Sequence, residues 1–299
     1  MEMGKIFIIC PPKTATGGTE ALHQLCDALT NLGKDASIVY VPNFGIQELT
    51  PRQFSDYDIC VSDAIEDIEE NAVVIPEIWC ELLSHIHYAK VYLWWLSVDN
   101  AHITNGIYRD DVTHLAQSEY ARQYLADTLK LNNVEWLSDY INDAYFSIDP
   151  VVKREDVVLF NPKKGFENTA QLIMASNGTI KWQAINDMTS YEIVEAMDSA
   201  KVYIDFGNCP GKDRLPREAI LRGCVIFTST KGGFGNDIDI PIPKSHKFDT
   251  MNNVLNKIYE CMQSDLGFEM RKKQMDAYQQ ICNEKERFLE DVGRVFKEY

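Results

Sequence analysis

The chain has 299 residues and a formal net charge of −16 at pH 7, with 45 Asp and Glu against 29 Lys and Arg. Hydrophobic residues make up 45% and charged residues 25%, which is typical of a globular protein, and the length predicts about two domains. The acidic charge excludes a general binder of nucleic acid or of anionic membranes, but it leaves room for a local basic pocket.

The cysteines and the apolar segments indicate the cellular compartment of the protein. Its eight cysteines are scattered without a C-x-x-C pair, so we expect buried, reduced thiols. The N-terminal residues run directly into an apolar strand without a long signal region, and the most apolar run, VYLWWLSV at 91–98, is too short to cross a bilayer. We therefore expect a soluble, cytoplasmic protein.

Short apolar segments alternate with amphipathic ones along the first half of the chain. Residues 5–10 (KIFIIC) predict a buried strand, and the apolar residues of 21–33 recur at helical spacing. Further strands are predicted at 37–42, 57–62, 72–76, 90–97, 113–118 and 134–137, and a further helix at 119–130. Strands that alternate with helices indicate a parallel sheet covered on both faces.

A second series of the same kind begins near residue 155. Strands are predicted at 157–162, 180–185, 201–207 and 224–230, with helices after the first three of them and a mostly helical tail from about 249. Thr189 with Glu192 three residues later has the pattern of a capping box. The two series predict an α/β protein of two Rossmann-like halves, joined near residues 138–155.

A glycine-containing turn follows the first predicted strand. Gly17 and Gly18 lack a Cβ atom and stand where the next helix begins, so backbone N–H groups there can approach an anion closely. The turn departs from the G-x-G-x-x-G pattern, so a nicotinamide dinucleotide is not its natural ligand. A tight turn without a ligand is the alternative interpretation.

A second turn, CPGKDRLPRE at 209–218, gathers positive charge in this acidic chain. Lys212, Arg214 and Arg217 follow a predicted strand and accompany the start of a helix, and that combination favours phosphate. Glu218, in the first turn of the helix, is suited to accept hydrogen bonds from a ribose diol. Lys163, Lys164 and Lys231 also follow predicted strands of this half. Solvated surface charge is the alternative interpretation.

Four segments, in this order along the chain, resemble the retaining, nucleotide-sugar-dependent glycosyltransferases of the GT-B fold (glycosyl transferases group 1, family 4-like). They are PPKTATGGTEALHQLCDALTNLGKDASIVYV at 11–41, THLAQSEYARQYL at 113–125, VVLFNPKKGFENTAQLI at 157–173 and IDFGNCPGKDRLPREAILRGCVIFTSTKGG at 204–233. The resemblance implies a GT-B fold, in which two Rossmann-like domains with parallel sheets face a cleft. It implies an acceptor domain over 1–145, a nucleotide-sugar donor domain over 146–280, and a C-terminal helix over 281–299 that packs back on the first domain.

The resemblance also assigns roles to residues at strand ends. The residues that it places at the donor nucleotide-sugar are Gly17, Gly18, Lys163, Lys164, Lys212, Arg214, Arg217 and Glu218. The family has a second Glu eight residues before the one that matches Glu218, facing the donor sugar, and this chain has Pro210 there. Asp213, or Asp205 at the end of its strand, is a candidate to replace it.

The strand over 90–97 leads to the candidates on the acceptor side. Asp99 and His102 follow its carboxyl end, and with Asp213 they form our prediction of the catalytic groups; a structural or surface role is the alternative for His102. Trp94 and Trp95 point to opposite sides of a strand, so we expect one in the core and consider sugar stacking for the other. His85 and His87 lack a partner at metal-ligand spacing, and no metal site is predicted.

We therefore expect a retaining, metal-independent glycosyltransferase that moves a sugar from a nucleoside-diphosphate donor to a glycan or lipid-linked acceptor, in polysaccharide biosynthesis. The nucleotide sugar is a substrate, so no cofactor is expected, and no nucleic-acid partner either. The alternatives are a nucleotide-sugar epimerase and a catalytically inactive binding protein of the same fold. The base, the sugar, the acceptor, peripheral membrane contact and the oligomeric state stay open.

Overall fold

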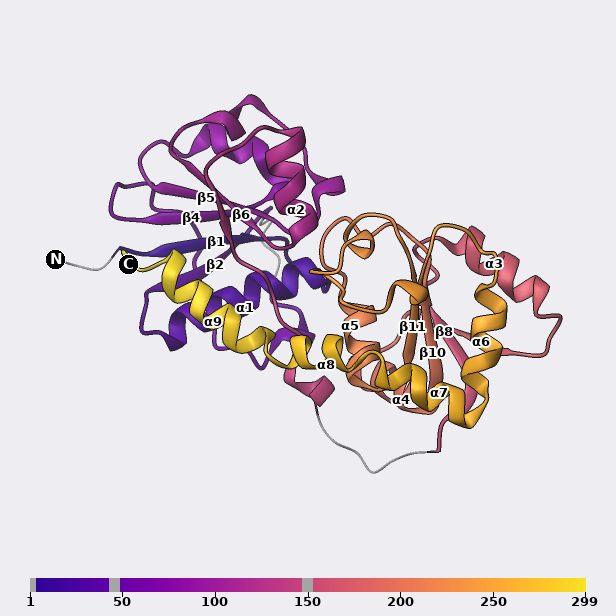
Figure 1. The fold of residues 1–299 in the computed structure, drawn as a ribbon. Helices are drawn as coiled ribbons and strands as arrows, with labels where there is room; N and C mark the ends of the chain where they lie inside the picture. The colour runs from indigo at the N-terminus through magenta and orange to yellow at the C-terminus, as the bar shows by residue number, and fades with distance from the viewer. Residues whose placement is uncertain (1–3, 43–48, 147–152) are drawn as a thin grey trace. The chain divides into compact units, whose positions relative to one another are not determined.

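The computed structural model describes residues 4–42, 49–146 and 153–299, and the chain forms two compact units (Figure 1). The first unit combines Met1–Tyr140 with Glu284–Tyr299, and the second unit is Ile141–Asn283. Each unit is a parallel sheet with helices, so the predicted α/β class of two Rossmann-like halves is confirmed. In the described ranges, no helix has the length and apolar composition that crossing a bilayer requires.

The described residues of the first unit form a seven-stranded sheet in which all pairs are parallel. Its strands are β1 (Ile6–Cys10), β2 (Ala36–Tyr40), β3 (Cys60–Val61), β4 (Ala72–Pro76), β5 (Lys90–Trp95), β6 (Val112–Ala116) and β7 (Val134–Trp136). Their order is β3-β2-β1-β4-β5-β6-β7. The central strands read as continuous apolar runs because both faces of the sheet are buried.

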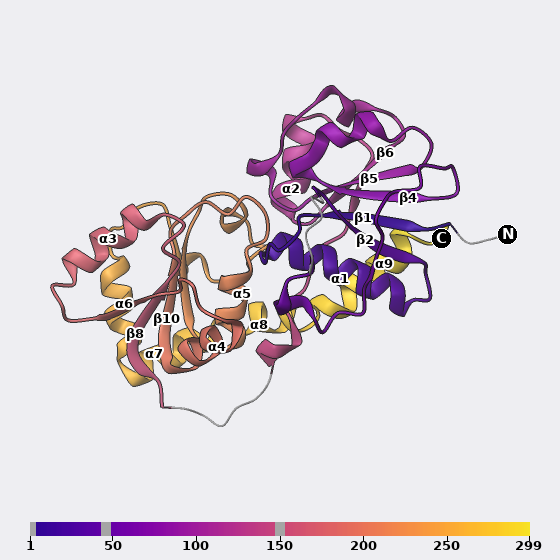
Figure 2. The ribbon, with the colours of Figure 1, turned by 180° about the vertical axis from the view of Figure 1, so that it is seen from behind.

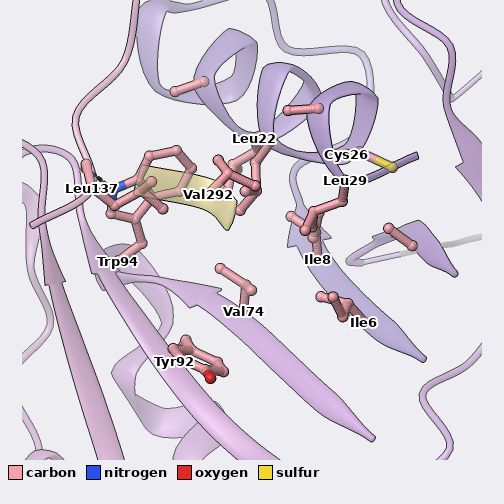
Figure 3. Packing of buried hydrophobic residues seen from close by; sticks show 14 of the residues in the cluster. Ile6, Ile8, Leu22, Cys26, Leu29, Val74, Tyr92, Trp94, Leu137 and Val292 are labelled. Carbon is pink, nitrogen blue, oxygen red and sulfur yellow. Dashed lines mark hydrogen bonds between the residues drawn. The ribbon is translucent and has the colours of Figure 1, made fainter. Parts of the chain in front are cut away.

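Helix α1 (Gly17–Asn31) covers one face of this sheet. Thr16 is its N-cap, and the Thr16 side chain accepts from the Thr19 N–H in a capping box, while Gly33 at φ +76° follows its end. Figure 3 shows Leu22 and Leu29 of this helix facing the apolar side chains of β1 and β4. The leucines of α1 recur every three or four residues, which places them on one face and makes the helix amphipathic.

Helix α9 (Glu284–Val295) completes the same core, although it follows the second unit in the sequence. It lies beside α1 in both views of the molecule (Figures 1 and 2). Phe288 and Val292 are buried, and the Phe288 ring lies 5.3 Å from that of Tyr140. Two shorter elements, α2 (Glu119–Gln123) and the 3-10 segment η2 (Glu77–His85), belong to the first unit as well.

The described residues of the second unit form a five-stranded parallel sheet. Its strands are β8 (Glu155–Phe160), β9 (Lys181–Ala184), β10 (Ala200–Asp205), β11 (Val225–Ser229) and β12 (Lys247–Phe248), in the order β12-β11-β10-β8-β9. Its helices are α3 (Phe166–Ala175), α4 (Ser190–Ser199), α5 (Arg214–Leu221), α6 (Val254–Met262), α7 (Ser264–Lys272) and α8 (Met275–Cys282). The predicted capping box of Thr189 and Glu192 opens α4.

The strand order defines one switch point in each sheet. In the first unit, β1 lies between β2 and β4, so the chain leaves β1 on one side and returns on the other. In the second unit, β8 lies between β9 and β10 in the same way. Loops diverge at such a point and leave a crevice at the carboxyl ends of the strands, where open α/β sheets bind their ligands.

Candidate functional site

Two loops meet at the switch point of the second unit. One follows β8 at 161–165, and the other follows β10 at 206–213. A Cβ atom on Gly165 would lie 2.5 Å from the backbone N of Gly207, and a Cβ on Gly207 would lie 2.6 Å from the Cβ of Lys164. Glycine at both positions therefore allows the loops to touch, and this contact sets Lys164 beside the start of the second loop.

Lys164 forms an ion pair between the two loops. Its Nζ donates to Oδ2 of Asp213 at 2.6 Å, and both side chains are partly exposed. Burial acts to lower the pKa of Lys164, but Asp213 and, more weakly, Asp205 outweigh it, so the pKa lies above its ordinary value. The lysine is therefore charged, partly exposed and paired with Asp213.

Asp205 ends β10 and lies beneath this pair, 2% exposed. Its Oδ1 accepts from the Gly207 N–H at 3.0 Å, and the Tyr203 hydroxyl donates to its Oδ2 at 3.4 Å. Burial, followed by the charge of Asp213, raises the pKa of Asp205 to about 7. Thr228 is its partner on β11, and the buried Oγ1 of Thr228 has no hydrogen-bond partner in the part of the chain described.

The basic loop leads into α5, as the sequence predicts. Lys212 and Arg214 are partly exposed there, and Lys163 is exposed on the loop after β8. Arg217 is fully buried, and it donates to the carbonyl oxygens of Asp213 at 3.2 Å and Lys212 at 3.0 Å. Its guanidinium thus braces the loop from inside, and a direct contact with a donor stays a prediction. Glu218, 7% exposed, is the fifth residue of α5, so the expectation that it lies in the first turn is wrong, because the helix already begins at Arg214.

The loop after β11 supports the basic loop through backbone contacts. The Gly233 N–H donates to the Cys209 carbonyl at 2.7 Å, and the Cys209 N–H donates to the Lys231 carbonyl at 3.4 Å. A Cβ atom on Gly233 would lie 2.4 Å from the Gly211 carbonyl oxygen. Three consecutive strand-end loops of this sheet therefore form one connected surface that carries Lys163, Lys164, Lys212, Arg214 and Lys231.

The first unit has its own group of predicted residues. Gly17 and Gly18 are the first residues of α1, and a Cβ atom on Gly18 would lie 3.7 Å from Cδ1 of Leu96, just beyond β5. Asp99 lies in a short 3-10 turn, Val98–Asn100, and both it and His102 are exposed. The site residues therefore divide into one group in each unit, each at the carboxyl edge of its sheet.

Glu77 is a buried acid at this edge that sequence reasoning missed. It follows β4 directly, is 2% exposed, and its carboxylate accepts from the backbone N–H groups of Leu96 at 3.0 Å and Ser97 at 2.9 Å. Burial raises the pKa of Glu77 to about 7. The one signal in the sequence is an acidic residue immediately after the apolar run AVVIP.

The tryptophans of β5 correct one expectation. Trp94 and Trp95 are both fully buried, and their indole N–H groups donate to the Leu137 carbonyl at 2.9 Å and to Nδ1 of His114 at 3.1 Å. The interpretation that one of them stacks on a sugar is therefore wrong. Within residues 4–42, 49–146 and 153–299, no three His, Cys, Asp or Glu side chains gather as a metal site would require.

No protein-family model and no curated protein matches the sequence. Among solved structures, the chain is similar to a glycosyltransferase from Rickettsia africae over 100% of both chains, at 13% identity and a TM-score of 0.68. It is similar to Anabaena HepE in complex with UDP-glucose over 99% of this chain and 100% of HepE, at 12% identity and a TM-score of 0.66. T4 phage BGT in complex with UDP and Mn²⁺ matches over 97% of this chain and 99% of BGT, at 13% identity and a TM-score of 0.61. Together with the order of the two parallel sheets, these similarities show that the chain has the GT-B fold of glycosyltransferases.

Proposed function

We propose that the protein is a glycosyltransferase that moves a sugar from a nucleoside-diphosphate sugar to a glycan or lipid-linked acceptor. One observation carries the proposal: Lys164 and the loop with Lys212 and Arg214 meet at the switch point of the second unit. The similar structures with UDP-glucose and UDP support a uridine nucleotide as the first donor to test.

The donor diphosphate would bind at this crevice. Lys164, Lys212 and Arg214 supply positive charge, and the first N–H groups of α5 add the positive end of its dipole. Glu218 is the acceptor for the ribose hydroxyl groups. Asp213 and Lys164 are paired in the structure, so an incoming phosphate would share the lysine with that carboxylate.

The chemistry breaks the bond between the anomeric carbon and the diphosphate oxygen and forms a bond from that carbon to an acceptor hydroxyl oxygen. The nucleoside diphosphate leaves with the bonding electron pair, and the acceptor hydroxyl loses its proton. Cationic side chains stabilise the charge that grows on the leaving phosphate. We propose retention of anomeric configuration, with the leaving phosphate assisting removal of the proton, and we keep Asp99, His102 and Asp213 as the proposed catalytic side chains.

Binding of UDP and UDP-glucose, measured by calorimetry, tests the donor site. We expect Lys212→Ala and Glu218→Ala each to weaken binding at least about tenfold, because each removes a charged partner of the ligand. Lys181→Ala is the matched control, since this exposed lysine opens β9 at the opposite edge of the same sheet. Unchanged affinity in both site variants, with folding confirmed by circular dichroism, would refute the assignment.

Release of UDP from UDP-glucose separates the enzyme from the alternatives. A transferase releases UDP, whereas an epimerase converts the donor without any acceptor. Pro210, where the resemblance expects a Glu, favours a third candidate, a binding protein without catalysis. That protein would bind UDP-glucose and release no UDP.

Turnover that persists in EDTA and does not rise with added Mn²⁺ is expected if the cationic side chains alone stabilise the leaving group.

The wider setting is part of the same proposal. We assign the reaction to polysaccharide biosynthesis in the cytoplasm, where nucleotide sugars are the donors. Contact with a membrane surface would follow if the acceptor is lipid-linked.

A further inference from the structure

Glu77 occupies the switch point of the first unit. It is the first residue after β4, and β4 is the direct neighbour of β1, which leads to Gly17 and Gly18 at the start of α1. Ligands of open α/β sheets bind in this crevice. Glu77 is 2% exposed, and burying a carboxylate is costly unless hydrogen bonds compensate for the lost contact with water.

The hydrogen-bond donors to Glu77 are backbone amides of the neighbouring strand end. Oε2 of Glu77 accepts from the Leu96 N–H at 3.0 Å, and Oε1 accepts from the Ser97 N–H at 2.9 Å. The Glu77 carbonyl oxygen accepts from the His102 N–H at 3.4 Å. Glu77 therefore holds both ends of the segment 96–102, which follows β5.

The held segment carries the predicted groups of the first unit. Ser97 precedes the 3-10 turn Val98–Asn100, which contains Asp99. Leu96 lies against Gly18 at the start of α1, where a Cβ atom would be 3.7 Å from the leucine Cδ1. The two amide contacts of Glu77 thus hold the backbone that leads from Leu96, beside the start of α1, into the turn that contains Asp99.

We propose that Glu77 is a positioning residue of the acceptor side, and that its carboxylate holds residues 96–102 in the conformation that transfer requires. The inference rests on the proposed function. Glu77 acts through the backbone, since its oxygens are already engaged with Leu96 and Ser97. Loss of this hold lowers the rate of transfer and leaves donor binding in the second unit unchanged.

Glu77→Gln tests the inference because it keeps the shape of the side chain and turns an N–H₂ group toward one of the amides. The control is Glu119→Gln, which changes another buried glutamate of the first unit whose carboxylate pairs with Arg122 on its own helix. The readouts are the Kd for UDP and the kcat and KM for release of UDP from UDP-glucose with water as acceptor. We expect kcat to fall at least about tenfold in Glu77→Gln alone, with Kd and KM within about twofold.

A double variant separates positioning from general damage. If Glu77 acts through the turn of Asp99, Glu77→Gln has little further effect on kcat when Asp99 is already Asn. Full additivity of the two substitutions, or an unchanged kcat in Glu77→Gln, would overturn the inference.

Failure of the proposed function would look different. A wild-type protein that neither binds UDP nor releases it from UDP-glucose refutes the transferase, and Glu77 is then judged by amide hydrogen exchange. Faster exchange of the Leu96 and Ser97 amides in Glu77→Gln, with the rest of β5 still protected, supports the hold on this segment. Equal exchange in both proteins contradicts it.

Discussion

Two buried carboxylates mark the switch points of the two sheets, Glu77 in the first unit and Asp205 in the second. Both have a pKa raised to about 7, mainly by burial. A raised folded-state pKa means that the folded protein binds the proton more tightly than the unfolded chain. The stability that each proton contributes is therefore complete below about pH 4 and is lost as the pH rises through the folded-state pKa.

Asp205→Asn should change how stability depends on pH. The shift of the Asp205 pKa from 3.8 to about 7 corresponds to up to about 4 kcal/mol of folding stability. The wild type loses this stability as the pH rises from 3.8 to about 7, and the variant, which has no carboxyl group there, does not. The variant amide can still accept from the Gly207 N–H. We expect its melting temperature to rise relative to the wild type as the pH goes from 5 to 8.

The matched control for this comparison is Asp156→Asn. Asp156 lies on β8 of the same sheet and is exposed, and its partner is Lys201. Its effect on the melting temperature should stay constant across the same pH range. A constant difference for Asp205→Asn as well would show that the carboxyl does not hold a proton in the folded state.

Sequence could identify exposed strand-end residues more easily than buried ones. Lys164 and Asp213 were predicted individually because charged residues after strands are visible in the pattern, and the structure brings them to 2.6 Å. Glu77 was missed because its partners lie nineteen and twenty residues further along, just after the neighbouring strand β5. Arg217 is predicted as a phosphate ligand, and no sequence pattern indicated that its guanidinium is buried and donates to the carbonyl oxygens of Asp213 and Lys212; its contact with a donor stays a prediction.

Among the elements, α9 contributes to the core of the first unit, although it follows the second unit in the sequence. Phe288 is 1% exposed and packs among α1, Tyr140 and the first sheet. We expect Phe288→Ala to destabilise the first unit by about 3–5 kcal/mol, because the site cannot collapse fully around the missing ring. Leu289→Ala, one residue further and 38% exposed, should cost little.

Chemical unfolding followed by hydrogen exchange can assign this loss to one unit. Faster exchange in β1 and β4, with β8 and β10 unchanged, is the expected pattern for Phe288→Ala. A loss spread equally over both sheets would contradict the assignment of α9 to the first core.

The strands and helices were predictable because apolar residues recur differently along the sequence in the two kinds of element. Buried strands read as short apolar runs, α1 has helical spacing, and α4 opens with the predicted capping box, which the structure confirms. The 3-10 segment η2 escaped prediction because it has a break at Trp79, with φ −129° and ψ 44°, and no sustained helical period. Strand β12 has two residues, too few to give any pattern.

At the scale of the whole molecule, each unit has a parallel sheet with one switch point. If the donor binds in the second unit alone, UDP should slow amide exchange in the loops at 161–165 and 206–214. The amino end of β9 and helix α9 should be unaffected. Mass spectrometry of exchanged peptides with and without UDP measures this, and protection centred in the first unit would contradict the donor assignment.

The membership of α9 in the first unit has a consequence for synthesis. A ribosome makes Met1–Tyr140 first, then all of Ile141–Asn283, and only afterwards the helix that supplies Phe288 and Val292 to the earlier core. Domains made early usually fold early. Here the first unit cannot complete its core until α9 has been made, so the apolar residues of α1 and of the sheet that α9 covers stay exposed while the second unit is synthesised. Folding during translation therefore ends with the unit that began it.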